Sequence, residues 1–248
     1  MRVNRCDAFW LVVHTFFGDR GRGCVADGGI GDVQVLPLSQ EQFTTVEALV
    51  PASCEAYRVM DRFCLALPRD NDNLRQETLD GFFRWLGRDY ERFIDVPRNL
   101  ENIAVLVGLL GLVPPAVIGD FGCGSGLAHA TVSAVGYAVI GVDTCPVMRE
   151  LARTRGMRTF SPSEFAATDL PVDGMISSYV LHFRPERLSL SLCWSRLRRG
   201  GRFAANIHKA QGLDRALAQF AQLNGRVLSV GSRAGMERHG IYLQIEKP

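Results

Sequence analysis

The feature that most constrains this chain is the segment VIGDFGCGSGLAHA, residues 117–130. An apolar run leads into Asp120, and glycine then occupies every second position, at Gly122, Gly124 and Gly126. A stretch of small residues compatible with a helix follows. This order predicts a strand, a tight loop and a helix, in which the loop lacks side chains so that a ligand can approach its backbone.

Composition narrows the class of protein. The 248 residues are 47% apolar and 22% charged, which is enough material for a substantial core. The formal net charge of +2 is too weak a basic balance to indicate a nucleic-acid partner. No apolar run approaches the roughly 20 residues needed to span a bilayer. The seven cysteines are widely spaced and form no CxxC pair, which favours reduced thiols in the cytoplasm over disulfides or a metal site.

The second half of the chain alternates between two patterns. Short apolar stretches predict seven strands, at 116–121, 138–142, 157–160, 173–180, 202–207, 226–230 and 240–246. Helices are predicted between them, at 126–135, 146–155, 186–199 and 211–224. Buried strands that alternate with helices indicate an α/β fold with a Rossmann-like, doubly wound, mostly parallel seven-stranded sheet.

The first half is predicted to hold an N-terminal helical cap. Residues 1–38 include a glycine-dense stretch and are expected to be a poorly ordered leader. Ser39 and Gln42 resemble a capping box at the start of a cap or lid over 39–112. Further helices are expected over 53–66, 73–86 and 98–111. A Pro-Pro pair then marks the start of the core, residues 113–248.

Two classes of ligand compete for the glycine loop. A dinucleotide oxidoreductase would use GxGxxG with a third glycine at position 127, where this chain has Leu127. Beyond the loop, the next apolar stretch ends in Asp143, and an acidic group there can accept hydrogen bonds from both hydroxyls of a ribose. An NAD-dependent oxidoreductase therefore stays an alternative.

Four successive segments carry a resemblance to a known family. DFGCGSG, GVDTCPVMRELAR, DGMISSYVLHF and LRRGGRF resemble the ordered signatures of class I S-adenosylmethionine-dependent methyltransferases, in the style of the small-molecule group. The resemblance covers 113–248 and implies S-adenosylmethionine as cofactor. It implies methyl transfer to oxygen, nitrogen or carbon of a small-molecule metabolite by in-line displacement, without a metal. A methyltransferase-like module that binds the cofactor without turnover is the other alternative.

The resemblance assigns roles at the strand ends. Asp120 would hold the amino group of the methionine moiety, and Asp143 would bind the ribose hydroxyls. The loop that contains Cys123, itself interpreted as a small apolar filler, would let the backbone approach the cofactor. Other residues expected beside the cofactor are Gly122, Gly124, Gly126, Thr144, Met148 and Ser178.

The adenine contact departs from the family pattern. The family usually has an acidic residue at the end of the third strand, and here Ser161 occupies that place. Glu164 or the backbone at Phe165 would then contact the adenine instead.

Three residues are candidates for the chemistry. Tyr179 would lie near the reacting methyl group, and His182 and His208 follow the fourth and fifth core strands, where a general base would sit. His182 is the first choice, although a lone histidine is more often structural. The run SSYV replaces the Asp/Asn-Pro-Pro-Tyr/Phe motif of many nucleic-acid methylases, which favours a small-molecule acceptor.

The cap is expected to close over the cofactor and supply the acceptor pocket. Tyr90 and Arg98, at the end of its aromatic-rich stretch, are the candidate substrate residues. Aromatic residues at this helical spacing more often form a core. The sequence leaves the acceptor, the methylated atom and the oligomeric state open.

Overall fold

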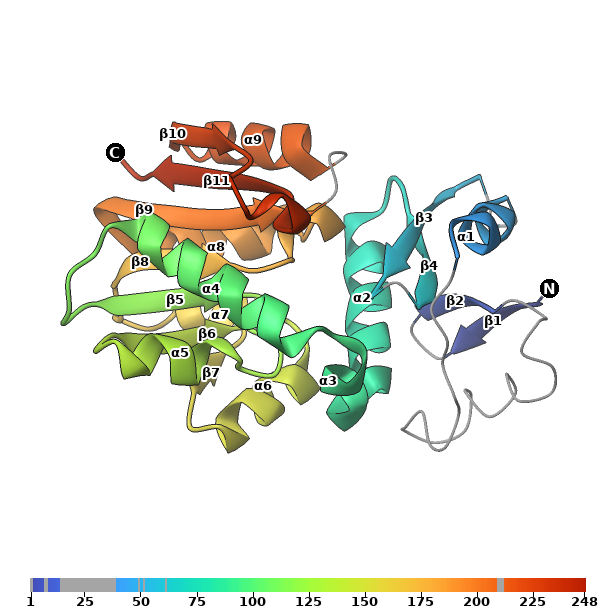
Figure 1. Cartoon of the computed structure of the whole chain (residues 1–248), viewed down its shortest axis with the longest axis horizontal. Coiled ribbons are helices and arrows are strands. Elements are labelled where there is room, and N and C mark those ends of the chain that lie inside the picture. Colours follow the sequence, from blue (N-terminus) through green and yellow to red (C-terminus); the bar gives the residue numbers. More distant parts are fainter. Residues whose placement is uncertain are drawn as a thin grey trace. The chain divides into compact units, whose positions relative to one another are not determined.

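A computed structural model describes residues 2–6, 9–13, 39–48, 50, 52–60, 62–208 and 212–248. The chain divides into two compact units, Met1–Ile94 and Asp95–Pro248, both drawn in Figure 1. The glycine-dense stretch 18–32, and with it most of the leader expected over 1–38, lies outside the described residues. Among the described helices, none is long and apolar enough to cross a membrane.

The N-terminal unit combines an antiparallel sheet with helices. Its strands are β1 (Arg2–Cys6), β2 (Phe9–Val13), β3 (Cys54–Val59) and β4 (Phe63–Pro68), in the order β1-β2-β4-β3. Its helical elements are α1 (Gln40–Glu47), α2 (Asp72–Leu86), the short turn η2 (Gly87–Asp89) and α3 (Tyr90–Phe93). The predicted capping box begins α1, because the Ser39 N–H donates to Gln42 Oε1 at 2.8 Å and the Gln42 N–H to Ser39 Oγ at 3.1 Å.

The helix predicted over 53–66 is wrong. That stretch forms β3 and most of β4, and every residue of β4 is buried. Apolar residues in a short continuous run do not distinguish a buried strand from a buried helix, and the β-hairpin partner decides between them. The N-terminal unit is therefore a mixed α and β structure rather than a helical cap.

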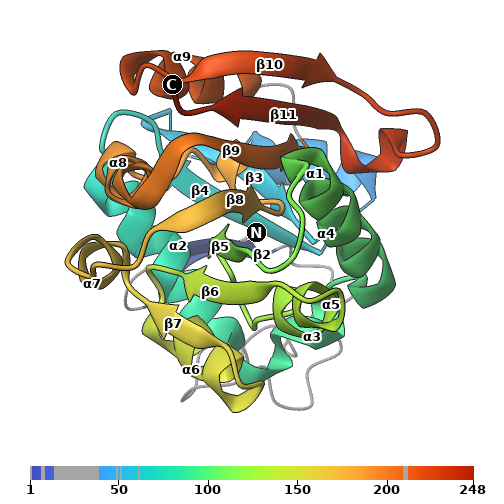
Figure 2. The same cartoon turned by 90° about the vertical axis from the view of Figure 1, so that its left-hand side faces the viewer.

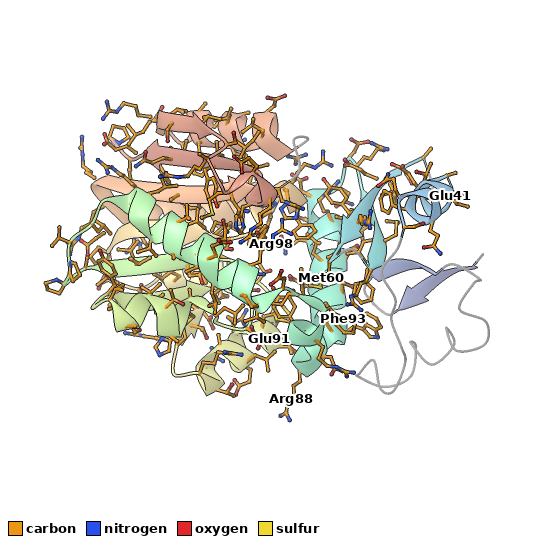
Figure 3. The ribbon with its side chains drawn as sticks, viewed as in Figure 1. Glu41, Met60, Arg88, Glu91, Phe93 and Arg98 are labelled. Atoms are coloured by element: carbon orange, nitrogen blue, oxygen red, sulfur yellow. The ribbon has the colours of Figure 1, made fainter. Side chains whose placement is uncertain are left out.

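The aromatic-rich stretch of the sequence packs into the interior of this unit. The Phe63 ring on β4 lies edge-on to Phe82, Trp85 and Phe93, with ring centroids 5.3, 5.9 and 5.3 Å away. Figure 3 labels Phe93 at the end of α3. These contacts agree with the interpretation of the aromatic residues as core.

The C-terminal unit has the predicted α/β fold. Its seven strands are β5 (Val117–Phe121), β6 (Ala138–Val142), β7 (Arg158–Phe160), β8 (Val172–Ser177), β9 (Leu197–Ile207), β10 (Arg226–Gly231) and β11 (Ile241–Glu246). They follow the order β10-β11-β9-β8-β5-β6-β7, in which β5 to β9 pair in parallel and the last two strands are antiparallel. The doubly wound, mostly parallel sheet is thus confirmed.

Helices cover both faces of this sheet. They are α4 (Val96–Leu110), α5 (Ala128–Ala134), α6 (Pro146–Thr154), α7 (Pro162–Ala166), α8 (Arg187–Arg196) and α9 (Leu213–Gln222), with turns η3 (Leu181–Phe183) and η5 (Glu237–His239). Figure 2 shows α4 and α5 on one face and α7 and α8 on the other. Along β8, Met175 packs into one core and Ile176 into the other, as expected for a strand buried on both faces.

Helix α4 belongs to the sheet and not to the cap, in which the sequence placed it. The boundary between the units lies at Ile94, before α4, whereas the sequence put it after residue 112. Ile103, Leu106 and Leu110 give α4 an apolar stripe that packs on the sheet. The Pro-Pro pair therefore marks the turn into β5 and not a boundary between the units. The sequence did not reveal that α4 belongs to the sheet, because the partner of an apolar helix face is set by tertiary packing.

Candidate functional site

The glycine loop turns sharply at the end of β5. Gly122 has a φ of +75° and Gly126 a φ of +84°, a region that favours glycine. A Cβ on Gly122 would lie 2.4 Å from a methyl group of Val180, and one on Gly126 would lie 2.9 Å from the backbone Cα of Ala152. Both positions need glycine because neighbouring segments approach the loop closely.

Asp143 fastens this loop to the end of β6. Its Oδ2 accepts a hydrogen bond from the Gly124 N–H and its Oδ1 one from the Cys145 N–H, both at 2.9 Å. Arg149 on α6 donates to the main-chain oxygens of Asp143 and Thr144, both at 2.8 Å. The hydrogen bonds from the Gly124 and Cys145 N–H groups fix the Asp143 carboxylate beside the backbone of the glycine loop.

A second acid lies buried on the neighbouring strand. Asp120 is 4% exposed and pairs in register with Gly141 of β6. Burial, and then the negative charge of Asp143, raise the pKa of Asp120 to about 7 from its ordinary 3.8. A carboxylate in such a place is stabilised by a cationic partner, for example an ammonium group.

Cys123 and Met148 contribute packing. The Cys123 thiol is buried, and burial followed by the charges of Asp143 and Asp120 raises its pKa well above the ordinary range. Its sulfur would touch a Cβ built on Gly141 at 2.7 Å. The Cys123 side chain thus fills space between segments, as predicted. Its predicted contact with the cofactor would be made by its backbone. Met148 is 1% exposed within α6.

The two residues suggested for the adenine are used within α7. Ser161 and Glu164 form a capping box, in which the Ser161 N–H donates to Glu164 Oε2 at 2.7 Å and the Glu164 N–H to Ser161 Oγ at 3.2 Å. These hydrogen bonds lower the pKa of Glu164. The Phe165 N–H donates to the Ser161 oxygen at 2.9 Å, and its own carbonyl accepts from Thr168. The contact of Glu164 or Phe165 with an adenine stays a prediction.

Ser178 joins a buried polar network that the sequence did not predict. Asn102 of α4 donates to Ser178 Oγ at 2.8 Å and to Asn206 Oδ1 at 3.0 Å, and it accepts a hydrogen bond from the Tyr242 hydroxyl at 2.8 Å. Asn102 and Asn206 are fully buried. The sequence contained one signal for this network, because Asn102 is a polar residue within the apolar pattern of a predicted helix.

The three candidate residues for the chemistry lie together beyond the ends of β8 and β9. The Tyr179 ring centroid is 5.8 Å from that of His208, which is 6.3 Å from that of His182. His182 is buried on η3, whereas His208 is exposed. Val180, between Tyr179 and η3, packs against the glycine loop, so this group adjoins the loop.

Comparison with known proteins identifies this architecture. Residues 119–205 match a family model described as a methyltransferase domain. This segment is a methyltransferase domain. The family predicted from the sequence is confirmed, and S-adenosylmethionine is the cofactor of the class I enzymes to which that prediction refers. No curated protein has a matching sequence.

Solved structures with the same fold are distant in sequence. A 1,6-didemethyltoxoflavin-N1-methyltransferase from Burkholderia thailandensis has a TM-score of 0.56 and 19% identity, covering 80% of this chain and 97% of that one. A TehB-like methyltransferase from Corynebacterium glutamicum has a TM-score of 0.51 and 19% identity, covering 64% and 97%. A magnesium protoporphyrin IX methyltransferase from Synechocystis has a TM-score of 0.51 and 15% identity, covering 73% and 98%.

The two predicted substrate residues fall in different units. Arg98, labelled in Figure 3, lies in the first turn of α4, and its guanidinium is 5.9 Å from the Tyr179 ring centroid. It also donates to the main-chain oxygen of Arg238. Arg98 therefore adjoins the predicted chemistry of the methyltransferase domain. Tyr90 belongs to the N-terminal unit, where its ring lies 6.1 Å from that of Phe83, and its role stays a prediction.

The sequence reasoning missed two further residues of the methyltransferase domain near Tyr179. Glu101 lies on α4 and His239 on η5, and both contact the Tyr179 region. Neither falls in a recognised motif. Within the described residues, no cluster of His, Cys, Asp or Glu is arranged to hold a metal ion.

Proposed function

We propose that this chain transfers the methyl group of S-adenosylmethionine to an oxygen, nitrogen or carbon atom of a small molecule. The observation that carries the proposal is the pair of acids at the ends of β5 and β6 around the glycine loop. Asp120 is buried with a raised pKa, and the Asp143 carboxylate is fixed beside the loop by the Gly124 and Cys145 N–H groups. These two carboxylates are acceptors that fit an ammonium group and a pair of hydroxyls.

Different residues bind different parts of the cofactor. Asp120 holds the amino group of the cofactor, and Asp143 holds its ribose hydroxyls. Gly122 and Gly126 keep the loop thin and close to its neighbours. When bound, S-adenosylmethionine supplies an electrophilic methyl group, so the protein has chiefly to orient the acceptor against it and to exclude water.

A small acceptor is supported by the surroundings of the site. Tyr179, His182 and His208 gather beside the loop and offer polar groups to a compact molecule. The similar protein from Burkholderia thailandensis was crystallised with 1,6-didemethyltoxoflavin and S-adenosylhomocysteine, which are small ligands. The weak net charge gives no support to a nucleic-acid partner. Free thiols, in keeping with the proposed cytoplasmic location, are found at Cys54, Cys64, Cys123, Cys145 and Cys193.

Calorimetric titration with S-adenosylhomocysteine tests the assignment. Asp143→Ala is expected to weaken binding by about 10- to 100-fold, because it removes the hydrogen bonds from the ribose hydroxyls to a charged acceptor. Asp173→Ala is the matched control, because Asp173 Oδ2 accepts the Val117 N–H at 2.8 Å at the opposite edge of the sheet. Equal affinities for the two variants would remove Asp143 from the site.

Two further measurements separate the alternatives. Saturable binding of NADH in place of S-adenosylhomocysteine would favour the oxidoreductase. Tight binding of S-adenosylmethionine without methyl transfer to any acceptor in a broad panel would favour a binding module without turnover.

A further inference from the structure

Three side chains from separate elements form a continuous chain of hydrogen bonds. The Tyr179 hydroxyl lies 2.5 Å from His239 Nδ1, and His239 Nε2 lies 2.9 Å from Glu101 Oε2. His239 is fully buried, and Glu101 is about one-third exposed on its side chain. The order of groups is phenol, imidazole and carboxylate.

The fold brings these groups to the carboxyl edge of the parallel strands. Tyr179 follows β8, and η5 leads into β11, whose first residue pairs with Ile207 at the end of β9. Helix α4 runs antiparallel to β9, because Leu110 accepts from Arg202 in the middle of β9 and Asn102 contacts Asn206 near its end. The N-terminal turns of α4 therefore reach the edge at which such sheets bind ligands.

One buried side chain fixes both ends of the Tyr179–His239 contact. Asn206 Oδ1 accepts the Tyr179 N–H at 2.8 Å, and Asn206 Nδ2 donates to the His239 carbonyl at 2.9 Å. Tyr179 has a φ of +58°, which is costly for a residue with a side chain. The surrounding hydrogen bonds hold it there, and such strain occurs preferentially at functional sites.

The carboxylate sets the direction of the hydrogen bonds. Hydrogen bonds from Arg238 and His239 lower the pKa of Glu101, so Glu101 is an acceptor. We assign the His239 proton to Nε2, because Glu101 Oε2 at 2.9 Å is nearer to it than the Arg238 Nε donor at 3.5 Å; Nδ1 then accepts from the Tyr179 hydroxyl. The Tyr179 oxygen keeps lone pairs for a donor from outside the protein. Burial raises the pKa of Tyr179, so its phenol is protonated at neutral pH.

We propose that Tyr179, His239 and Glu101 form a proton relay that deprotonates the acceptor, which is therefore a phenol or enol methylated at oxygen. This proposal rests on the proposed methyl transfer. The acceptor O–H gives its proton to Tyr179 Oη as the Tyr179 proton passes to His239 Nδ1, and the acceptor oxygen forms its bond to the methyl group as the carbon–sulfur bond breaks. The positive charge lost from sulfur reappears on the His239 imidazolium beside Glu101.

The charged surroundings favour a phenol or enol over an amine. The Arg98 guanidinium over the Tyr179 ring stabilises negative charge on the Tyr179 oxygen as the proton leaves. Arg238 pairs with Glu101, whose carboxylate lies 2.9 Å from His239 Nε2 and would face the imidazolium formed in the relay. A phenol acceptor and the Tyr179 side chain belong to the same chemical class, so the proton passes between two oxygens of similar ordinary acidity as the second proton passes to His239. A neutral amine would not need this relay before it attacks.

The state of His239 is measurable without turnover. The measurement is NMR of the full chain with isotope-labelled histidine. The chain has five histidines, and the resonances of His239 are those that the His239→Gln variant lacks. Nitrogen chemical shifts are expected to show a proton on Nε2 and none on Nδ1, both before and after saturation with S-adenosylhomocysteine. Tyr179→Phe should shift the Nδ1 resonance, because it removes the donor. A proton found on Nδ1 would overturn the relay.

Turnover then separates a relay from a structural contact. The acceptor panel pairs phenols with anilines of the same substitution, and includes para-methylphenol and the already ionised para-nitrophenol. Tyr179→Phe is expected to lower kcat about 100-fold or more for para-methylphenol but less than about 10-fold for para-nitrophenol, with KM nearly unchanged. Glu101→Gln, a change in a positioning residue, should show the same dependence on acceptor acidity. Equal losses for the two phenols would make the contact structural.

A matched control and the binding assay keep the outcomes distinct. Tyr137→Phe removes another tyrosine hydroxyl, which donates to the Leu112 oxygen at 2.7 Å away from the relay, and should leave both rates unchanged. Methylation of anilines but of no phenol would overturn the relay alone. Failure to bind S-adenosylhomocysteine, or binding without transfer to any acceptor, would overturn the proposed function itself.

Discussion

Replacing Asp120 by asparagine is expected to stabilise the ligand-free protein at neutral and alkaline pH. Burial and the nearby charge of Asp143 raise the pKa of Asp120 to about 7, whereas the unfolded chain keeps the ordinary value of 3.8. Between these two values the native state binds more protons than the unfolded state. The contribution of Asp120 to the free energy of unfolding therefore falls as the pH rises from about 4 to about 7.

The size of the effect follows from the two pKa values. Each pKa unit corresponds to about 1.4 kcal/mol, so ionised Asp120 costs the native state about 4 kcal/mol at pH well above 7. At about pH 4.5 most of this cost is absent. The stabilisation of Asp120→Asn relative to the wild type should therefore be about 3 kcal/mol larger at pH 8 than at pH 4.5.

Urea denaturation of both proteins at the two pH values measures this difference. Every titrating group other than Asp120 is common to the two chains, so most of the background cancels in the comparison. An Asp143→Asn background should reduce the effect, because the charge of Asp143 is the second cause of the raised pKa. A difference between Asp120→Asn and the wild type that does not change with pH would refute the reasoning.

The same variant tests the role of Asp120 in binding. If Asp120 holds the cofactor's amino group, that cation favours the ionised carboxylate, and saturating S-adenosylhomocysteine should reduce the pH dependence of the wild type. Asp120→Asn should then bind S-adenosylhomocysteine more weakly although it is more stable. Unchanged affinity would remove Asp120 from the site.

Two further predictions concern packing. Gly126→Ala should lower the free energy of unfolding by about 2–4 kcal/mol, because its Cβ would meet the backbone of Ala152. Gly235 has a similar φ of +77° but open space around it, so Gly235→Ala should lower the free energy of unfolding by only about 1 kcal/mol. Asn102→Ala should cost about 2–4 kcal/mol, because it leaves buried partners unsatisfied, whereas Asn99→Ala loses only a bond to its own helix and should cost less than about 1 kcal/mol. Urea denaturation checks both pairs, and equal losses within a pair would contradict the contact described.

The sequence predicted the core well where its signals are local. Each apolar run with flanking glycine gave a strand within a few residues of its observed bounds, and the order of strands and helices indicated the parallel sheet. The sequence placed Asp120 and Asp143 beside the glycine loop in the same way, since Asp120 lies near the end of β5 and Asp143 directly follows β6. Such features depend on neighbours in the chain, which the sequence displays directly.

Predictions failed where a segment needs a distant partner. The run in β4 became a strand because β3 pairs with it, and α4 joined the sheet because its apolar stripe covers the strands. The sequence also did not predict the short helix α7, to whose cap and backbone Glu164 and Phe165 contribute. The suggested adenine contacts of these two residues stay predictions.

By itself, the sequence determined the sheet, the thin glycine loop and the two acids beside it, because these follow from periodicity and from the conformational freedom of glycine. Only the tertiary structure placed Glu101, Asn206 and His239 around Tyr179. Hydrogen bonds between residues so far apart along the chain exist only after α4, β9 and η5 pack at one edge of the sheet. The group around Tyr179, to which we assign the acceptor, is therefore a product of packing, and the glycine loop with its two acids, to which we assign the cofactor, is a product of local sequence.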